Sequence, residues 1–178
     1  MDVDEAYKRL VEDVLRDGKM SQNRTGINTL RMSGAMMRIK LGPELPILTT
    51  KKVAFHSIVT ELLMFINGNT NNAELVANKV NIWTANSSEE NMKPKGLEAG
   101  DLGPVYGFQW RHFGADYKDR YTNYDGMGID QLVEAIIKVD TTPSSRQNIV
   151  SAWNPMQIGI MALPPCHFAF QLIVSDNK

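Results

Sequence analysis

The stretch "HSIVTELLMFIN", residues 56–67, is apolar on nearly every side when it is drawn as a helix. Gly68 follows it and is typical of a helix end. We therefore expect a central helix that is buried all round, and this helix decides the fold. Its single acid, Glu61, either pairs with a base, points outward to water, or is held partly desolvated as a proton-transfer group.

Around this helix, helical and extended patterns alternate without the regular βαβ order of a doubly wound fold. Helical spacing of apolar residues recurs at about 7–18, 71–79 and 129–137. Alternation with a period of two predicts strands within 29–41, 148–154 and 167–174. The polar segments 86–104 and 114–128 are expected to be long exposed loops. The sequence thus predicts an α+β fold with a mixed or antiparallel sheet and a buried central helix.

The composition predicts one globular domain over residues 1–178, because 43% of the residues are apolar and 22% are charged. Basic and acidic residues are interspersed and the formal net charge is −1, so neither a nucleic-acid surface nor a membrane surface is expected. The one cysteine cannot form an internal disulfide, and the N-terminus lacks the apolar core of a signal peptide. These features predict a cytoplasmic protein.

The only cysteine, Cys166, follows two prolines in "MALPPCHFAF", residues 161–170. In a strand its thiol would share a face with apolar side chains and pack like a small hydrophobic residue. The prolines cannot donate to a sheet ladder, however, which favours a position at a strand start or edge with one side open. There, His167 would be placed to orient water or a substrate, and cationic neighbours would favour a reactive thiolate.

Other polar and aromatic residues have two interpretations each. Arg24 in "NRTG" and Arg146 in "SSRQN" are either solvated surface residues or guanidinium groups that hold phosphate through paired hydrogen bonds. Trp83, Tyr106 and Trp110 either pack in the core or line a flat pocket for a planar heterocycle. The three histidines have no metal-ligand spacing, so no metal site is expected.

Eight segments follow one another along the chain: "NRTGINT", "PILTTKK", "ELLMFINGNT", "VNIW", "GDLGPVYGFQWRHFGADY", "IDQL", "SRQNIVSAWNP" and "MALPPCH". In this order they resemble the thymidylate synthase family, from about Tyr7 to the end of the chain. The segment "GFQWRHFGADYKD" and the long loop before "GDLGPVYG" are more similar to the eukaryotic and viral members. The resemblance implies the fold of that family, represented by an N-terminal portion.

The resemblance also implies an activity, which is reductive methylation of dUMP at C5. The co-substrate 5,10-methylenetetrahydrofolate would supply both the carbon and the hydride, without a metal. Cys166 would be the nucleophile that adds to C6 of uracil. Glu61 would manage proton transfers through water near O4 of the pyrimidine. Tyr106 and His167 would support that network.

Binding residues are implied in the same way. Arg24 would hold the nucleotide phosphate in its own subunit, and Arg146 would reach across a homodimer interface into the partner's site. Lys51 would lie near the glutamate tail of the folate. The pterin pocket would be lined by Ile82, Trp83 and Asn86.

The chain departs from the family pattern at two positions. Gln147 stands where the family usually has a second arginine, and losing one charge-assisted contact costs about 1.5–3 kcal/mol. Met64 stands where tryptophan is common, a change that a flexible thioether can fill.

Family members also continue well beyond "SDNK", so we expect the chain to be incomplete at its C-terminus. Two alternatives to methylation stay open. One is a pyrimidine-nucleotide hydroxymethylase of the same fold, in which water instead of hydride finishes the reaction. The other is a truncated, non-catalytic chain that dimerises with a full-length partner.

Overall fold

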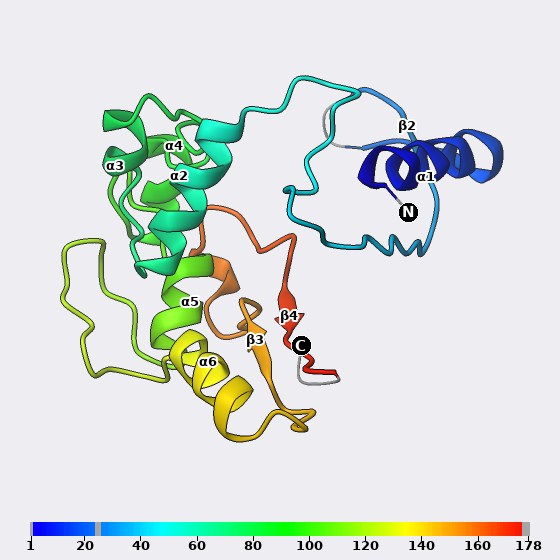
Figure 1. Ribbon diagram of the computed structural model, residues 1–178. Coiled ribbons are helices and arrows are strands. Elements are labelled where there is room, and N and C mark those ends of the chain that lie inside the picture. Colours follow the sequence, from blue (N-terminus) through cyan, green and yellow to red (C-terminus); the bar gives the residue numbers. More distant parts are fainter. Residues whose placement is uncertain (1, 24–25, 176–178) are drawn as a thin grey trace. The chain divides into compact units, whose positions relative to one another are not determined.

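The computed structural model describes residues 2–23 and 26–175 (Figure 1). The chain forms two compact units, residues 1–54 and residues 55–178. In the described residues the first unit has one helix and the second unit several, and each has its own two-stranded antiparallel sheet. The combination of helices with small antiparallel sheets agrees with the predicted α+β class.

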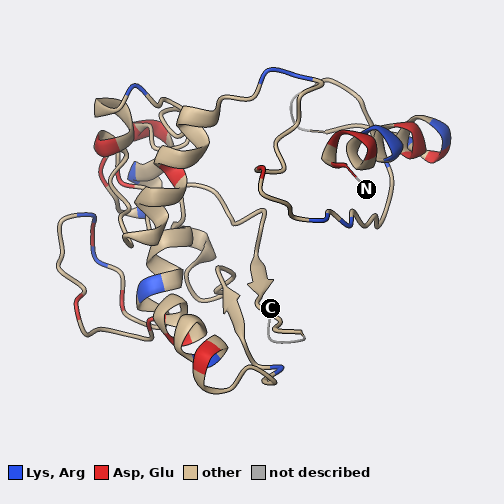
Figure 2. Cartoon of the chain, viewed as in Figure 1, with Lys and Arg blue, Asp and Glu red and all other residues tan. Residues whose placement is uncertain are grey.

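The first unit begins with helix α1 (Val3–Asp17). Acidic residues occupy its first turn and Arg16 its last turn, which complements the helix dipole, and Figure 2 shows charges of both signs along it. Gly18 follows the helix in extended conformation, and its N–H donates to the carbonyl oxygen of Val14 at 2.9 Å. A Cβ at this position would clash with that oxygen, which favours glycine. The helix predicted over about residues 7–18 is confirmed.

Two short strands follow, β1 (Lys19–Ser21) and β2 (Thr29–Arg31). They pair antiparallel, with Met20 opposite Leu30. Of the region 29–41, in which strands were expected, only the first three residues form a strand. Gly34, where the alternation of the sequence is interrupted, has a φ of +73°.

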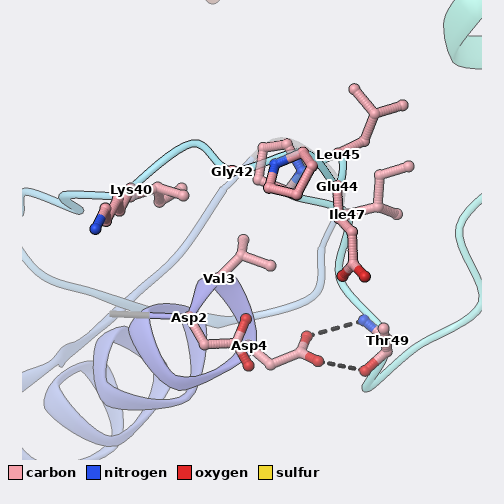
Figure 3. A pocket seen from close by; sticks show the side chains of 12 residues that line it. Asp2, Val3, Asp4, Lys40, Gly42, Glu44, Leu45, Ile47 and Thr49 are labelled. Carbon is pink, nitrogen blue, oxygen red and sulfur yellow. Dashed lines mark hydrogen bonds between the residues drawn. The ribbon is translucent and has the colours of Figure 1, made fainter.

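The N-terminal end of α1 and the segment 39–49 line a cavity of about 400 Å³ (Figure 3). The Asp4 carboxylate accepts hydrogen bonds from the N–H of Thr49, at 2.9 Å, and from the hydroxyl of the same residue. These hydrogen bonds lower the pKa of Asp4, the hydroxyl having the largest effect. The same unit holds Lys51, whose Nζ lies 5.7 Å from the ring centre of Tyr7.

The second unit contains most of the helices. In chain order its elements are α2 (Phe55–Ile66), α3 (Asn72–Ala77), α4 (Glu89–Met92), η1 (Lys93–Lys95), α5 (Tyr106–His112), α6 (Gln131–Thr141), β3 (Ile149–Ser151), η2 (Ile158–Ile160) and β4 (Ala169–Gln171). Strands β3 and β4 pair antiparallel, with Val150 opposite Phe170. The helices predicted near α3 and α6 are confirmed. The strands predicted near β3 and β4 are also confirmed, although each has only three residues.

The core of this unit is an aromatic cluster around Phe65, which is 2% exposed. Its ring centre lies 5.0 Å from that of Tyr106 and 6.1 Å from that of Trp110, the latter edge to face. Helices α2 and α5 approach closely here because Gly107 has no side chain. A Cβ at Gly107 would lie 2.8 Å from the carbonyl oxygen of Phe65. The close contact fixes where α5 begins.

Helix α2 is not buried all round, which corrects the prediction for residues 56–67. Met64 and Phe65 are buried, whereas Ile58 and Leu62 are 49% and 46% exposed. Contacts with α3 and α5 cover one face of the helix. Among the described residues, the apolar side chains on the other face stay open to solvent. A helix with apolar residues on every face can be packed on all of its faces or on one. In the residues that the structure describes, α2 is packed on one face only.

The segment 86–104 is not the exposed loop that its polar composition predicts. It contains α4 and η1, and the side chains of Met92 and Asp101 are 0% and 1% exposed. Ser88 begins α4 by accepting a hydrogen bond from the N–H of Asn91. The following α5 was also not predicted, because glycines bracket its aromatic run. The segment 114–128 contains neither helix nor strand, as expected.

A buried carboxylate, Asp101, fixes the turn that precedes α5. It accepts hydrogen bonds from the N–H of Gly103 at 2.8 Å and the N–H of Arg120 at 3.0 Å. The hydroxyl of Tyr117 also donates to it, at 2.5 Å. These donors satisfy the buried carboxylate. Burial and the adjacent Asp101 raise the pKa of Tyr117 well above its usual value of 10.0.

The buried hydroxyl of Tyr117 predicts a loss of stability in alkali. The unfolded chain releases this proton near pH 10 while the folded chain keeps it, so the free energy of unfolding falls as pH rises above about 10. Tyr117→Phe should reduce that fall, measured by urea unfolding at neutral and alkaline pH. The exposed Tyr121→Phe is the control. An equally steep fall in Tyr117→Phe would contradict the prediction.

The one-sided burial of α2 predicts very different costs for two truncations. Phe65→Ala should lower the free energy of unfolding by about 3–5 kcal/mol, because it opens a cavity among aromatic rings. Leu62→Ala on the exposed face should cost less than about 1 kcal/mol. Chemical denaturation of both variants tests this. Equal losses would mean that both faces of the helix are packed.

Candidate active site

The thiol of Cys166 is exposed and lies between Pro165 and strand β4. The backbone N–H of Cys166 donates a hydrogen bond to the hydroxyl of Tyr106, at 2.8 Å. Strand β4 begins only at Ala169, so the cysteine precedes the sheet ladder. Of the two interpretations of this residue, packing as a core hydrophobic residue is wrong and an open position next to a strand is confirmed.

Tyr106 begins helix α5 and carries its hydroxyl to the edge of the core. The residue is 5% exposed, and its ring stacks on that of His167 with centres 4.0 Å apart and planes at 15°. Burial raises the pKa of Tyr106, while the hydrogen bond from the N–H of Cys166 acts in the opposite direction. The hydroxyl therefore stays protonated at neutral pH. Its oxygen accepts the hydrogen bond from the Cys166 N–H, and its O–H can donate a hydrogen bond to another group.

The carboxylate of Glu61 has a specific partner in the core. The indole N–H of Trp83 donates to it at 2.5 Å, and Trp83 is 5% exposed. The Trp83 and Tyr106 rings are 6.3 Å apart and nearly perpendicular. Of the alternatives for Glu61, pairing with a base is not seen among residues 2–23 and 26–175. The carboxylate is half-buried and held by a neutral donor, an environment suited to accepting and returning a proton.

The structure brings five of the predicted site residues together. Glu61, Trp83, Tyr106, Cys166 and His167 are connected by the hydrogen bonds and ring contacts given above. An exposed thiol, a neutral phenol, an imidazole and a carboxylate are the groups needed for nucleophilic addition coupled to proton transfer.

The remaining predicted residues lie in several parts of the chain. Ile82 is next to Trp83 and is 50% exposed. The carbonyl of Asn86 accepts a hydrogen bond from a side-chain amide in α4. Arg146 is exposed, and its carbonyl accepts a hydrogen bond from the side chain of Gln171 at 2.9 Å.

Two predicted residues lie outside the second unit or outside the described residues. Lys51 belongs to the first unit, and Arg24 lies outside the described residues. Within residues 2–23 and 26–175, no group of three or more His, Cys, Asp or Glu side chains is arranged to hold a metal ion. None of the helices described is long and apolar enough to cross a membrane.

Sequence reasoning missed a group of amide side chains around α5. Gln109 in α5 is fully buried and donates to the carbonyl of Pro104 at 2.8 Å and to the side-chain oxygen of Gln157 at 2.7 Å. It also accepts from the side chain of Asn154 at 3.2 Å. These bonds hold residues 154–157 against α5. A glutamine inside an aromatic run was the available signal.

The fold and the exposed thiol define a site suited to covalent catalysis by cysteine. A family model described as thymidylate synthase matches residues 5–178, so the chain belongs to the thymidylate synthase family. The resemblance deduced from the eight segments is confirmed.

Three curated relatives illustrate the similarity. Each aligns over 175 residues, or 97% of this chain. The bifunctional dihydrofolate reductase-thymidylate synthase of Zea mays is 47% identical, and the chain spans 34% of it. Thymidylate synthase of Varicella-zoster virus (strain Dumas) is 46% identical, with 58% spanned. Thymidylate synthase 1/2 of Encephalitozoon cuniculi (strain GB-M1) is 45% identical, with 60% spanned. The chain therefore spans less than two thirds of each relative.

The hydrogen bond between Cys166 and Tyr106 yields a local prediction. Tyr106→Phe should speed hydrogen exchange of the Cys166 amide about fivefold, because the phenyl ring keeps the packing and removes one acceptor worth about 1 kcal/mol. Amide exchange measured by NMR or mass spectrometry reports the change. Tyr121→Phe, at an exposed tyrosine, should leave that amide unaltered. Unchanged exchange in Tyr106→Phe would show that the hydroxyl does not hold the loop.

Proposed function

We propose that the chain acts in the reductive methylation of dUMP to dTMP, with 5,10-methylenetetrahydrofolate as co-substrate. One observation carries the proposal: the exposed thiol of Cys166 is tied to the buried Tyr106, which lies beside the Glu61–Trp83 pair. Membership of the thymidylate synthase family supports the same reaction.

In this proposal Cys166 performs the covalent step. Its thiolate forms a bond to C6 of uracil, and the electron pair of the C5–C6 double bond moves towards O4 as an enolate. The enolate makes C5 nucleophilic, so one difficult alkylation becomes two feasible steps. The folate supplies the carbon and the hydride.

The neighbouring groups manage protons and position. Glu61, half-buried and held by the indole of Trp83, exchanges protons with water near O4. Tyr106 keeps its proton because burial raises its pKa, so its hydroxyl donates within this network while it fixes the backbone of Cys166. His167, stacked on that tyrosine, orients water beside the thiol.

The binding roles follow the family resemblance. Arg24 holds the phosphate of the nucleotide. Arg146 reaches into the site of a second copy, so the active form is a homodimer. Each subunit is one domain over residues 1–178, and the protein is cytoplasmic. Lys51 contacts the tail of the folate. The pterin contacts are those of Ile82, Trp83 and Asn86.

The names of the relatives favour methylation over hydroxymethylation, because each includes thymidylate synthase. The non-catalytic alternative makes a different prediction from the methylation proposal. If the chain only pairs with a longer partner, its thiol will not form a covalent complex with the nucleotide.

The test is covalent trapping with 5-fluoro-dUMP and 5,10-methylenetetrahydrofolate. Fluorine at C5 replaces the proton that must leave, so the adduct should accumulate. Intact-mass spectrometry should show one added nucleotide and one added folate per chain, mapped to Cys166. Since this is the only cysteine, Cys166→Ala should give no adduct.

The viral relative is the positive control for the reagents. If it is labelled and this chain is not, the proposed activity of this chain is wrong. Size-exclusion chromatography of the unlabelled chain mixed with that relative would then show whether the two form a mixed dimer, as the non-catalytic alternative requires.

A further inference from the structure

The ammonium group of Lys95, at the end of η1, is turned towards the segment that leads to the thiol. Its Nζ donates to the carbonyl oxygen of Met161 at 2.9 Å and to the side-chain oxygen of Asn91 at 3.1 Å. The carbonyl oxygen of Ala162 lies 3.5 Å away. Lys95 is partly buried, and this burial lowers its pKa. A desolvated ammonium group needs such acceptors, so its contacts are specific.

The amide of Asn91 connects the same segment to a second part of the site. Its Nδ2 donates to the carbonyl of Ala162 at 3.2 Å and also to the carbonyl of Asn86. Asn86 is one of the residues proposed to contact the pterin, and Ala162 lies four positions before Cys166. The Asn91 side chain therefore contacts the backbone of a proposed folate-binding residue and the backbone of the segment that leads to the thiol.

The backbone between Ala162 and Cys166 is suited to transmitting a displacement. The N–H of Ala162 donates to the carbonyl of Leu102 at 2.8 Å, and the N–H of Cys166 donates to Tyr106 at 2.8 Å. Between these anchors lie Leu163 and two prolines, whose rings fix their φ angles. Few torsions can absorb a shift of the carbonyl at Ala162, so such a shift reaches the cysteine.

We propose that Lys95 and Asn91 are positioning residues for the Cys166 thiol: they hold the carbonyl groups that precede it and so fix the loop that presents it. The inference rests on the proposed function, in which Cys166 is the nucleophile. The loop can nevertheless be examined without nucleotide or folate.

The experiment measures hydrogen exchange of the Cys166 backbone amide in the full chain, by NMR or mass spectrometry. This amide is protected by its hydrogen bond to Tyr106 while the loop is in place. Lys95→Met should exchange about fivefold faster at this amide, because the loop opens more often when it loses one net hydrogen bond. Amides of helix α6 should exchange at the original rate, which separates opening of this loop from a general loss of stability.

Two further variants provide the matched comparison. Lys93→Met removes a lysine from the same turn, where Nζ is exposed and pairs with Glu89 at 3.2 Å, and should leave the rate unchanged. Lys95→Arg keeps donors for the carbonyls and should return the rate to within about twofold. Recovery with arginine would show that a hydrogen-bond donor at this position holds the loop.

The proposal is overturned if the Cys166 amide of folded Lys95→Met exchanges at the original rate, or if Lys93→Met changes the rate equally. Where Lys95→Met does not fold, Asn91→Ala is measured in the same way, with the same expected increase and the same contradicting result. Because amide exchange uses no substrate, failure of the covalent trapping would leave this result intact. Failure here would likewise leave the proposed reaction intact.

Discussion

The hydrogen bond from the backbone N–H of Cys166 to the hydroxyl of Tyr106 joins an exposed thiol to a rigid core. The phenol can serve as this anchor because its ring is packed against Phe65 and Trp110, which leaves little freedom at its tip. That packing depends in turn on Gly107, since any side chain there would separate α5 from α2. The position of the reactive group is thus set by the distance between two helices.

Polar side chains around this core form hydrogen bonds to loop segments and fix their conformation. Asp101 gathers backbone and side-chain donors before α5, and Gln109 holds the segment after β3. Lys95 and Asn91 hold the carbonyls closer to the thiol. Loops lack the regular ladders that satisfy backbone groups in helices and sheets, so side chains must supply these partners. Such side-chain bonds supplement the backbone hydrogen bonds that also hold these loops.

Local patterns predicted several elements well and others poorly. The amphipathic period of α1 and α6 is visible in the sequence. The short helices α4 and α5 were missed, because polar or glycine-flanked residues become helical there through burial. The partner of Glu61 was also not predictable, since Trp83 lies 22 positions away along the chain and only the packing brings them together.

The sequence by itself determined the family, the α+β class and the identity of the one thiol, because these depend on motifs, periods and residue types. It also identified Glu61, Tyr106 and His167 as companions of Cys166 through the resemblance. The tertiary structure alone decided that α2 is covered on one face, that Glu61 meets an indole, and that Lys95 turns inward. Each of these contacts joins residues distant in sequence, and their formation depends on how whole elements pack and exclude water.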